Sequence, residues 1–237
     1  MSLELSCPYC HKPYVEQEFT SNGYTARFPM PQCTCEEEAQ KKAEAEERER
    51  ERLRRIAALN LPAIFEPYRL KDLTCEHAAD AQIYVEGFTP RKSKGLFIYG
   101  PNGNGKTTLG AVICKELAYR GRRVLFTTMS KTLNDMQEGG GYNMAATAQR
   151  VLKDLTTYDF VLFDDYGREN YSPLRLQNAF QIIDQLYTHR VVFAVTVNPE
   201  CMDRLAKIPE LEAIQDRMAQ VLMMWEFKNP SFRRAAK

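Results

Sequence analysis

Three features are scarce or missing in this sequence of 237 residues: net charge, long apolar runs and internal repeats. Lys and Arg (32) nearly balance Asp and Glu (31), so no whole-protein field attracts nucleic acid, and any DNA contact must come from a local patch. No apolar run approaches the roughly 20 residues of a membrane span. The first residues also lack the basic and apolar regions of a signal peptide. We therefore expect a cytoplasmic protein with no membrane partner.

The composition that is present suits a globular chain. Hydrophobic residues make up 44% and charged residues 27% of the sequence. The length allows one domain of ordinary size plus a smaller appendage. In the cytoplasm, the seven cysteines are expected to be thiols or metal ligands rather than disulfides.

Two close pairs of cysteines mark residues 1–35. They form a C-x₂-C knuckle and a C-x-C pair, and their members are Cys7, Cys10, Cys33 and Cys35. Four thiolates in two pairs suit a tetrahedral Zn²⁺ site, and His11 is an alternative ligand. The polar segment between the pairs is too short to bury a core, so a metal would supply the missing stability. We expect a zinc-binding module here; four free thiols in a loose tail are the alternative.

Residues 36–59 are almost all strong helix formers. Acid-first pairs at i,i+4, such as Glu44 and Arg48, stabilise an exposed helix. Almost no apolar stripe precedes Leu53, which predicts a solvated connecting helix. A spacer and a partner-binding helix both fit this pattern. Residues 60–237 would then form the main domain.

The segment Gly100-Pro-Asn-Gly-Asn-Gly-Lys-Thr107 fits the Walker A phosphate-loop pattern G-x-x-x-x-G-K-[ST] without a mismatch. An apolar strand over residues 95–99 precedes it and a helix over 106–118 follows, as the motif requires. Loop N–H groups would point at an anion, Lys106 would reach the β- and γ-phosphates, and Thr107 would bind Mg²⁺. The expected ATP- and ADP-binding residues are Gly100, Pro101, Asn102, Gly103, Asn104, Gly105, Lys106, Thr107 and Thr108.

A second apolar strand, predicted over residues 159–165, ends in Asp164 and Asp165. Continuous apolar residues are typical of a buried parallel strand. Asp164 could hold the Mg²⁺ shell, and Asp165 could polarise the attacking water. Two acids after an isolated strand usually make a turn, but the phosphate loop upstream favours a Walker B motif.

Two further polar residues follow later elements. Asn198 ends a strand predicted over residues 191–197, at the ligand edge of a parallel sheet. It could orient the water near the γ-phosphate or cap the turn before Pro199. Arg217 lies on a helix predicted over 210–219. It could make a solvated salt bridge or act as an arginine finger on the transferred phosphoryl group.

The overall pattern alternates strands and helices after the phosphate loop. It predicts an α/β fold in which a parallel sheet is flanked by helices. The other predicted helices span residues 75–87, 130–137, 144–158 and 172–187, and the other strands span 123–128 and 221–227.

The ordered motifs of residues 60–234 resemble the AAA+ ATPases of the DnaC/DnaI helicase-loader and IstB transposition-helper group. Besides the Walker A loop, the motifs that carry the resemblance are Phe163-Asp-Asp-Tyr-Gly167, Thr196-Val-Asn198, Ala213-Ile-Gln-Asp-Arg217 and Ser231-Phe-Arg233. A cysteine-bearing N-terminal region joined by a charged helix is also similar to loaders of this group.

The resemblance implies a P-loop AAA+ domain that hydrolyses ATP to ADP and phosphate with Mg²⁺, stimulated by DNA or a partner. It implies that Asn198 is sensor 1, that Arg217 reaches a neighbouring subunit's site, and that Arg233 senses the nucleotide. The catalytic set is then Lys106, Asp164, Asp165, Asn198 and Arg217.

The implied role is loading a hexameric replicative helicase, gripped through residues 1–59, onto single-stranded DNA. Copies of the chain would self-associate into a spiral or ring with ATP. A transposition helper on double-stranded DNA and a non-catalytic adaptor with a structural nucleotide are the alternatives. Lys131 and the loop over residues 139–142 are candidate DNA contacts.

Overall fold

The computed structural model describes residues 5–21, 23–59, 61–138, 143–229 and 231. The chain divides into two compact units, Met1–Leu53 and Arg54–Lys237. The three-part division expected from the sequence stays a prediction. Among the helices in these described ranges, none combines the length and apolarity that a membrane crossing requires.

The first unit contains a β-hairpin that the sequence reasoning missed. Strands β1 (Tyr14–Ser21) and β2 (Tyr24–Pro31) pair antiparallel. Directly opposed residues share a face, so the hairpin has two unlike sides. One side carries the ion pair of Glu18 with Arg27. The other carries exposed apolar side chains, which are Val15, Phe19, Tyr24, Phe28 and Met30.

Helix α1 (Cys35–Ala58) begins at the second cysteine pair and covers the predicted charged helix. None of its side chains is buried. Glu44 and Arg48 lie 3.6 Å apart, in the i,i+4 arrangement expected of an exposed helix. Leu59, directly after α1, is buried in the core of the second unit.

The second unit is an α/β structure with one five-stranded sheet. Every neighbouring pair of strands is parallel, in the order β4-β5-β6-β3-β7, so the predicted fold class is confirmed. The strands are β3 (Gly95–Tyr99), β4 (Val124–Thr128), β5 (Phe160–Tyr166), β6 (Val192–Val197) and β7 (Leu222–Glu226). The helices are α2 (Ala78–Gly87), α3 (Lys106–Tyr119), α4 (Met129–Gln137), α5 (Met144–Leu155), α6 (Pro173–Thr188), α7 (Pro199–Leu205) and α8 (Glu212–Val221). Short 3₁₀ turns cover Ala63–Phe65, Leu70–Asp72 and Pro209–Leu211.

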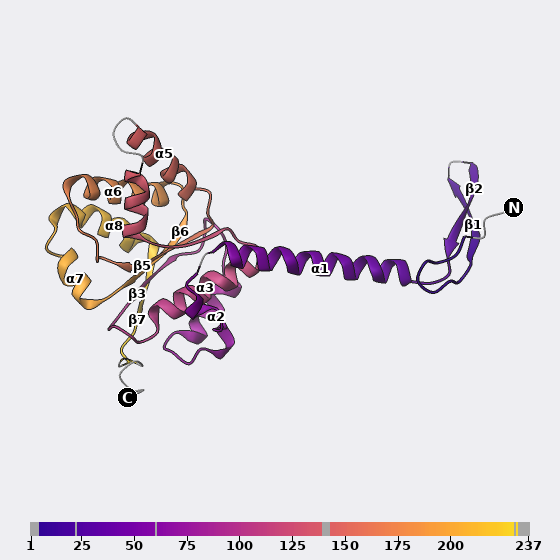
Figure 1. Cartoon of the computed structure of the whole chain (residues 1–237), viewed down its shortest axis with the longest axis horizontal. Coiled ribbons are helices and arrows are strands. Elements are labelled where there is room, and N and C mark those ends of the chain that lie inside the picture. The colour runs from indigo at the N-terminus through magenta and orange to yellow at the C-terminus, as the bar shows by residue number, and fades with distance from the viewer. Residues whose placement is uncertain (1–4, 22, 60, 139–142, 230, 232–237) are drawn as a thin grey trace. The chain divides into compact units, whose positions relative to one another are not determined.

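Helices cover both faces of the sheet. Successive side chains of a strand point to opposite faces, so each strand packs against both helical layers. On β5, Phe160 and Leu162 pack with α2 and α3, whereas Val161 and Phe163 pack with the helices α4 to α8. Figure 1 shows these two helical layers on either side of the strands. The continuous apolar strands of the sequence follow from this double burial.

Two helices are shorter than the sequence predicts. The helix expected over residues 75–87 begins at Ala78, because His77 adopts a left-handed φ of 61° and its ring stacks on Trp225. The helix expected over 144–158 ends at Leu155. There the hydroxyl of Thr156 donates to the Lys153 carbonyl and replaces the next helical turn.

The segment over residues 65–68, which precedes α2, is fixed to α3 by one lysine. The Lys115 ammonium donates to the carbonyls of Phe65, Glu66 and Tyr68 at 2.7–3.2 Å. Burial lowers the pKa of Lys115, and these three acceptors replace its lost hydration.

Candidate active site

The candidate site lies where β3, β5 and β6 end. These strands are neighbours in the sheet, so their carboxyl ends bring together three motifs that are far apart in sequence. The Walker A loop follows β3, the two aspartates end β5, and Asn198 follows β6.

The Walker A loop needs glycine at both of its ends. Gly100 has a φ of 150°, and a Cβ there would lie 2.4 Å from the Phe227 carbonyl oxygen. Gly105 has a φ of 98° and is the N-cap of α3. The helix therefore starts with its free N–H groups facing the loop, which suits a phosphate anion.

Lys106 is buried inside the loop that it belongs to. Its ammonium donates to the carbonyls of Gly100 and Pro101, at 2.7 and 2.6 Å, and to Asn104 Oδ1 at 3.2 Å. Asn104 Nδ2 is buried and has no partner among the described residues. The loop thus holds a positive charge, a buried amide donor without a partner and the start of α3, which fits a nucleotide's phosphates. Thr108 lies in the first turn of α3.

Asp164 and Thr107 are joined directly. The Thr107 hydroxyl donates to Asp164 Oδ1 at 2.9 Å, and the Thr196 hydroxyl donates to the same oxygen at 2.6 Å. Burial raises the pKa of Asp164, and the two hydroxyl donors oppose that rise. A hydroxyl and a carboxylate are oxygen ligands of the kind that Mg²⁺ prefers, so the pair fits this ion.

Asp165 is turned away from the line of its strand by a β-bulge. Asp164 and Asp165 together oppose Thr196, and Asp165 has a left-handed φ of 54°. Its N–H donates to the Thr196 hydroxyl at 2.9 Å. Its carboxylate accepts from Asn198 Nδ2 at 3.2 Å and pairs with Arg168 at 3.1 Å. The bulge therefore aims two consecutive carboxylates at different partners.

Asn198 does not use its side chain as a turn cap. It is the N-cap residue of α7, yet no cap hydrogen bond from its side chain forms. The side chain is 3% exposed and reaches Asp165 instead. Of the two interpretations open from the sequence, the structure supports a position beside the second aspartate.

Arg217 lies on α8, and its side chain contacts residues of α6 and α8 rather than the Walker motifs. Its Nε lies 3.2 Å from Asp184 Oδ1, and its Nη1 donates to the Ala213 carbonyl. The guanidinium also lies 4.7 Å from the centre of the Phe180 ring. Within the described ranges, these contacts do not join Arg217 to the chain's own phosphate loop.

Three of the remaining predictions concern Arg233, Lys131 and the loop over residues 139–142. Arg233 and the loop over residues 139–142 lie outside the described residues. Lys131, the other candidate DNA contact, pairs with Asp135 at 2.8 Å on α4. The DNA contacts stay predictions.

Three residues that shape the site were given no role from the sequence. Thr196 links both aspartates, and its signal was a lone hydroxyl in an apolar strand. Arg168 pairs with Asp165. Glu169 is 2% exposed and accepts from the Gly167 N–H and the Tyr171 hydroxyl, which fixes the loop after the bulge. Burial raises the pKa of Glu169; no sequence signal marked it.

The four N-terminal cysteines form a separate candidate metal site in the first unit. All their sulfur atoms lie within 4.8 Å of one another, and His11 is not in the cluster. The Tyr9 N–H donates to Cys7 Sγ at 3.4 Å, and Cys7 is fully buried. A backbone hydrogen bond from Lys12 and hydrogen bonds from the neighbouring thiols lower the pKa of Cys10 to about 7, and hydrogen bonding to Cys10 in turn raises the pKa of Cys35. The donor set fits one tetrahedral Zn²⁺.

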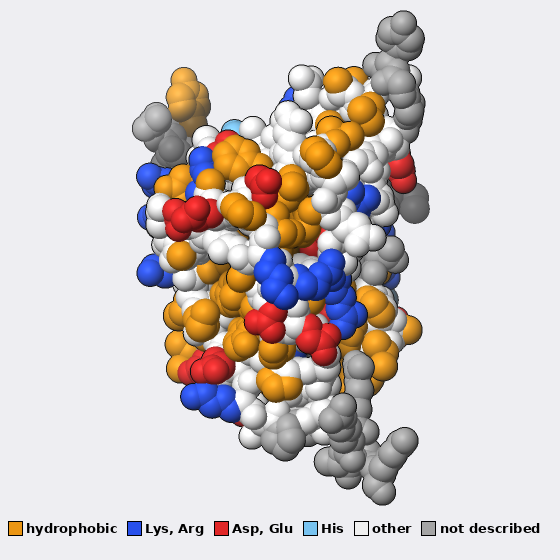
Figure 2. All heavy atoms as spheres, turned by 90° about the vertical axis from the view of Figure 1, so that its left-hand side faces the viewer, with side chains coloured by type: hydrophobic (Ala, Val, Ile, Leu, Met, Phe, Trp, Pro, Cys, Tyr) orange, Lys and Arg blue, Asp and Glu red, His pale blue; other side chains and the backbone are white. Residues whose placement is uncertain are grey.

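The surface on the α7 side of the second unit carries mixed charge. Figure 2 shows Lys and Arg side chains gathered beside Asp and Glu side chains there, among hydrophobic ones. This face therefore has no field of a single sign.

A protein-family model described as IstB-like ATP binding protein matches residues 34–237. The chain belongs to this ATP-binding family. The match begins between Cys33 and Cys35 and takes in α1 and the whole second unit. It leaves out the first cysteine pair and the hairpin, so the family assignment rests on the motifs of the candidate site and their scaffold.

Similar proteins agree with this assignment. The replicative helicase loader DnaC of Escherichia coli strain K12 is 28% identical over 178 residues, 73% of this chain and 70% of that protein. The loader of the same name from Buchnera aphidicola is 25% identical over 177 residues, 72% of this chain and 68% of that protein.

Solved structures share the fold. A crystal structure of the DnaC helicase loader matches with a TM-score of 0.59 and 18% identity, covering 70% of this chain and all of that one. A crystal structure of DnaI matches with a TM-score of 0.57 and 21% identity, covering 72% of this chain and 93% of that one. A structure of the replication initiator DnaA bound to AMPPCP and single-stranded DNA matches with a TM-score of 0.58 and 18% identity, covering 70% of this chain and 51% of that one. These likenesses show that the second unit shares its α/β fold with those proteins.

Proposed function

We propose that this protein is a cytoplasmic, ATP-dependent loader of a hexameric replicative helicase onto single-stranded DNA, in replication initiation or restart. The observation that carries the proposal is the assembled site: one sheet edge holds the Walker A loop, the Thr107–Asp164 pair and the Asp165–Asn198 pair. Such a site suits ATP turnover, and the relatives with similar sequences are named replicative helicase loaders.

ATP would bind with its phosphates in the Walker A loop. The Lys106 ammonium would exchange loop carbonyls for the β- and γ-phosphate oxygens, which carry more negative charge. Mg²⁺, held by Thr107 and Asp164, would neutralise charge on the same phosphates. Thr196 would keep the Asp164 carboxylate oriented through its 2.6 Å hydrogen bond.

Hydrolysis would rest on Asp165. Its carboxylate, turned aside by the bulge, would accept a proton from the attacking water. Asn198 would hold that carboxylate by donating to Oδ1. Arg168 has an exposed side chain, so its ion pair with Asp165 can open when a substrate arrives.

Arg217 would act on a second copy of the chain. Its contacts lie on α6 and α8, so it is not arranged to serve its own phosphate loop. In a spiral or ring, the guanidinium would instead stabilise charge on a neighbour's transferred phosphoryl group. ATP would then hold the assembly together only while the γ-phosphate is present.

Residues 1–59 would grip the helicase. The four-cysteine site, filled with Zn²⁺, would fix the hairpin that lies between its two cysteine pairs, and the hairpin would offer its exposed apolar side to the helicase. Exposed apolar patches of this kind mark protein–protein contacts more often than chance. The proposed DNA contacts remain Lys131 and the loop over residues 139–142.

A loading experiment tests the proposal. Full-length protein, a replicative helicase from the same host and circular single-stranded DNA would be mixed with ATP, and the helicase retained on the circles would be measured. We expect retention with the loader and ATP together, and much less with either one alone. Retention that is independent of the protein would exclude the loader role.

A transposition helper is the second candidate, because the matching family is the IstB-like one. It predicts binding to double-stranded DNA and recruitment of a transposase rather than of a helicase. A non-catalytic adaptor is the third, and a steady-state ATPase assay with and without single-stranded DNA separates it. No turnover in either condition would favour the adaptor.

A further inference from the structure

A basic pocket of about 570 Å³ lies at the end of the sheet away from the Walker A loop. Gly95 and Val192, the first residues of β3 and β6, both line it, whereas the Walker A loop follows the last residue of β3. Its volume is within the roughly 300–1,000 Å³ of small-molecule sites. The residues that define this basic pocket are Arg91, Lys92, Lys94, Arg190, Phe193 and Val221.

The cations of the basic pocket have no acidic partner in the part of the chain that the structure describes. None of the residues that line the pocket is Asp or Glu. Lys92, Lys94 and Arg190 are exposed, and no hydrogen bond or ion pair among the described residues engages their side-chain nitrogens. Lys131, by contrast, pairs with Asp135 on its own helix. Several cations without a counter-charge attract a ligand that itself carries several negative charges.

Arg190 occupies a backbone position that usually takes glycine. It follows the C-cap of α6, where its φ is 52°. The Arg190 N–H donates to the Tyr187 carbonyl at 3.1 Å, and the Val191 N–H donates to the Leu186 carbonyl at 2.8 Å. These are the two hydrogen bonds of a helix end that glycine normally closes. A strained cation of this kind is typical of a binding site, where the surrounding contacts maintain the strain.

Arg91 ties together the two turns that carry the cations. Its own φ is left-handed, at 64°. Its guanidinium donates to the carbonyls of Thr156 and His189 at 2.7 and 3.0 Å. His189 immediately precedes Arg190, so the turn before β3 is bonded to the turn before β6. The positive charges are therefore arranged before a ligand arrives, which lowers the entropic cost of binding.

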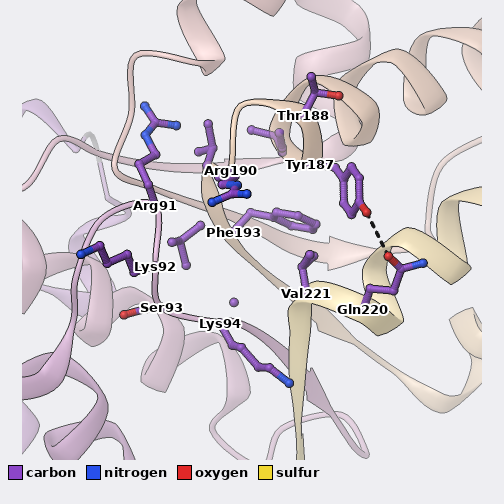
Figure 3. Close-up of a pocket in the computed structure, with 14 residues that line it drawn as sticks. Arg91, Lys92, Ser93, Lys94, Tyr187, Thr188, Arg190, Phe193, Gln220 and Val221 are labelled. Carbon is purple, nitrogen blue, oxygen red and sulfur yellow. Dashed lines mark hydrogen bonds between the residues drawn. The ribbon is translucent and has the colours of Figure 1, made fainter.

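The cations surround a hollow. Figure 3 shows Arg91 and Arg190 on one side of it and Lys94 on the other. Phe193 and Val221 also line the hollow and give it an apolar part. Converging charges suit a compact group of neighbouring phosphates, whereas a single strand of nucleic acid follows a positively charged groove. The apolar part suits a less polar portion of the same ligand.

We propose that the basic pocket is a second ligand site, which binds a small molecule with two or three adjacent phosphates and a less polar group the size of a nucleoside. Lys92, Lys94 and Arg190 would pair with the phosphate oxygens through charge-assisted hydrogen bonds. Arg91 would add positive charge while it keeps its carbonyl contacts. The inference does not rest on the proposed function, because no residue that lines the pocket belongs to the Walker motifs.

Titration calorimetry with inorganic tripolyphosphate tests the site. Full-length Lys106→Ala would be used, without Mg²⁺, because this change weakens the Walker A loop and leaves the basic pocket intact. The pocket variant adds Lys92→Ala/Lys94→Ala/Arg190→Ala to that protein. We expect its dissociation constant for tripolyphosphate to rise at least about tenfold, since three exposed ion pairs each contribute a factor of about two to three. ATP, titrated into the same two proteins, should show at least the same loss.

A matched control removes three exposed cations elsewhere in the second unit. Lys71→Ala/Arg120→Ala/Lys153→Ala, in the same Lys106→Ala protein, should leave the dissociation constant within about twofold.

A single substitution guards against misfolding. Arg190→Gly should melt no lower than the parent protein, because glycine adopts this left-handed conformation without the Cβ penalty. It should nevertheless bind tripolyphosphate about two- to threefold more weakly. Arg190→Lys keeps the charge and should restore most of the affinity.

Two outcomes would overturn the inference. If the pocket variant binds tripolyphosphate as tightly as the control variant, the basic pocket is not a phosphate site. If its tripolyphosphate binding is unchanged but its anisotropy with a labelled (dT)20 strand is lost, the pocket contacts nucleic acid instead. Neither titration involves a helicase, so both results leave the loader role to its own experiment.

Discussion

Asp164 concentrates the electrostatics of the candidate site at the scale of single residues. One of its oxygens accepts from Thr107 and Thr196 together, yet burial still raises its pKa above the ordinary value of 3.8. Without a cation, its negative charge is a cost to the fold. A magnesium ligand is expected to have these properties without its ion, because hydrogen bonds orient the buried carboxylate whose negative charge the cation would stabilise.

The raised pKa of Asp164 predicts the effect of Asp164→Asn. A carboxyl group with a raised folded-state pKa binds more protons when folded, so stability falls as pH rises from the ordinary value through the raised one. Asparagine keeps the Oδ1 acceptor and removes the charge. We expect the variant, without Mg²⁺, to melt a few degrees above wild type at pH 7.5, with a smaller gain near pH 4, and to lose ATP hydrolysis.

Thermal melts at both pH values check this expectation. Asp203→Asn, an exposed acid on α7, is the matched control and should leave the melting temperature unchanged. A variant that melts below wild type at pH 7.5 would show that the buried charge is already compensated.

The contact between Asn198 and Asp165 predicts a loss of rate without a loss of binding. Asn198→Ala removes the donor that holds the Asp165 carboxylate. We expect the maximal hydrolysis rate to fall about 10- to 100-fold, within the range that a positioned base contributes. The dissociation constant for ATP should change less than about threefold. Equal losses in rate and affinity would instead indicate that the site has collapsed.

At the scale of elements, the β-bulge and the strand ends determine where the motif side chains point, and the motif sequence alone does not show this. The sequence placed two acids at the end of a strand. In the structure, the two carboxylates point in different directions because of the bulge. Asp165 has a left-handed φ, and its N–H donates to the Thr196 hydroxyl. Helix α7 was not expected at all. It begins at Pro199 with Asn198 as its N-cap residue, and the Asn198 side chain makes no cap hydrogen bond but donates to Asp165 on β5.

The cysteine hairpin is the element where sequence reasoning fell shortest. The segment between the cysteine pairs was expected to be short and polar, although the Asn22-Gly23 pair in it is a known two-residue hairpin signal. Apolar residues also alternate along β2, where Tyr24, Phe28 and Met30 share one side, and this period-2 pattern is typical of a strand. A two-stranded hairpin alone is marginal in water, so a metal is the natural source of its stability.

Removing one cysteine tests this element. We expect wild type to hold about one Zn²⁺ per chain and Cys33→Ser to hold much less, measured by metal analysis of purified protein. Because the ATP-binding unit has its own core, its thermal transition should not move. Cys75→Ser, a cysteine outside the cluster, is the control. Wild-type zinc far below one per chain would contradict the site.

At the scale of the whole molecule, the open question is whether the ATP site is complete in one copy. Its own loop, aspartates and asparagine meet, but the expected finger Arg217 is held by Asp184 on α6. The salt bridge that the sequence offers as one interpretation exists in the single chain, and the finger that it offers as the other would act in an assembly.

Paired variants distinguish these two roles. Arg217→Ala should abolish DNA-stimulated hydrolysis and leave nucleotide binding nearly intact, because the finger serves a neighbour's transition state. Asp184→Asn breaks the same salt bridge and keeps the guanidinium. If the salt bridge were all that mattered, both variants would lose the same activity. We expect Asp184→Asn to retain most of the stimulated rate.

The sequence by itself determined the fold class, the phosphate loop, the two acids and the cysteine pairs, because glycines, strand-end carboxylates and cysteine spacing act locally. Only the tertiary structure decided how these residues face one another. Thr196 reaches Asp164 and Asp165 because β6 lies beside β5. Contacts of this kind depend on strand order and register, which no local pattern encodes.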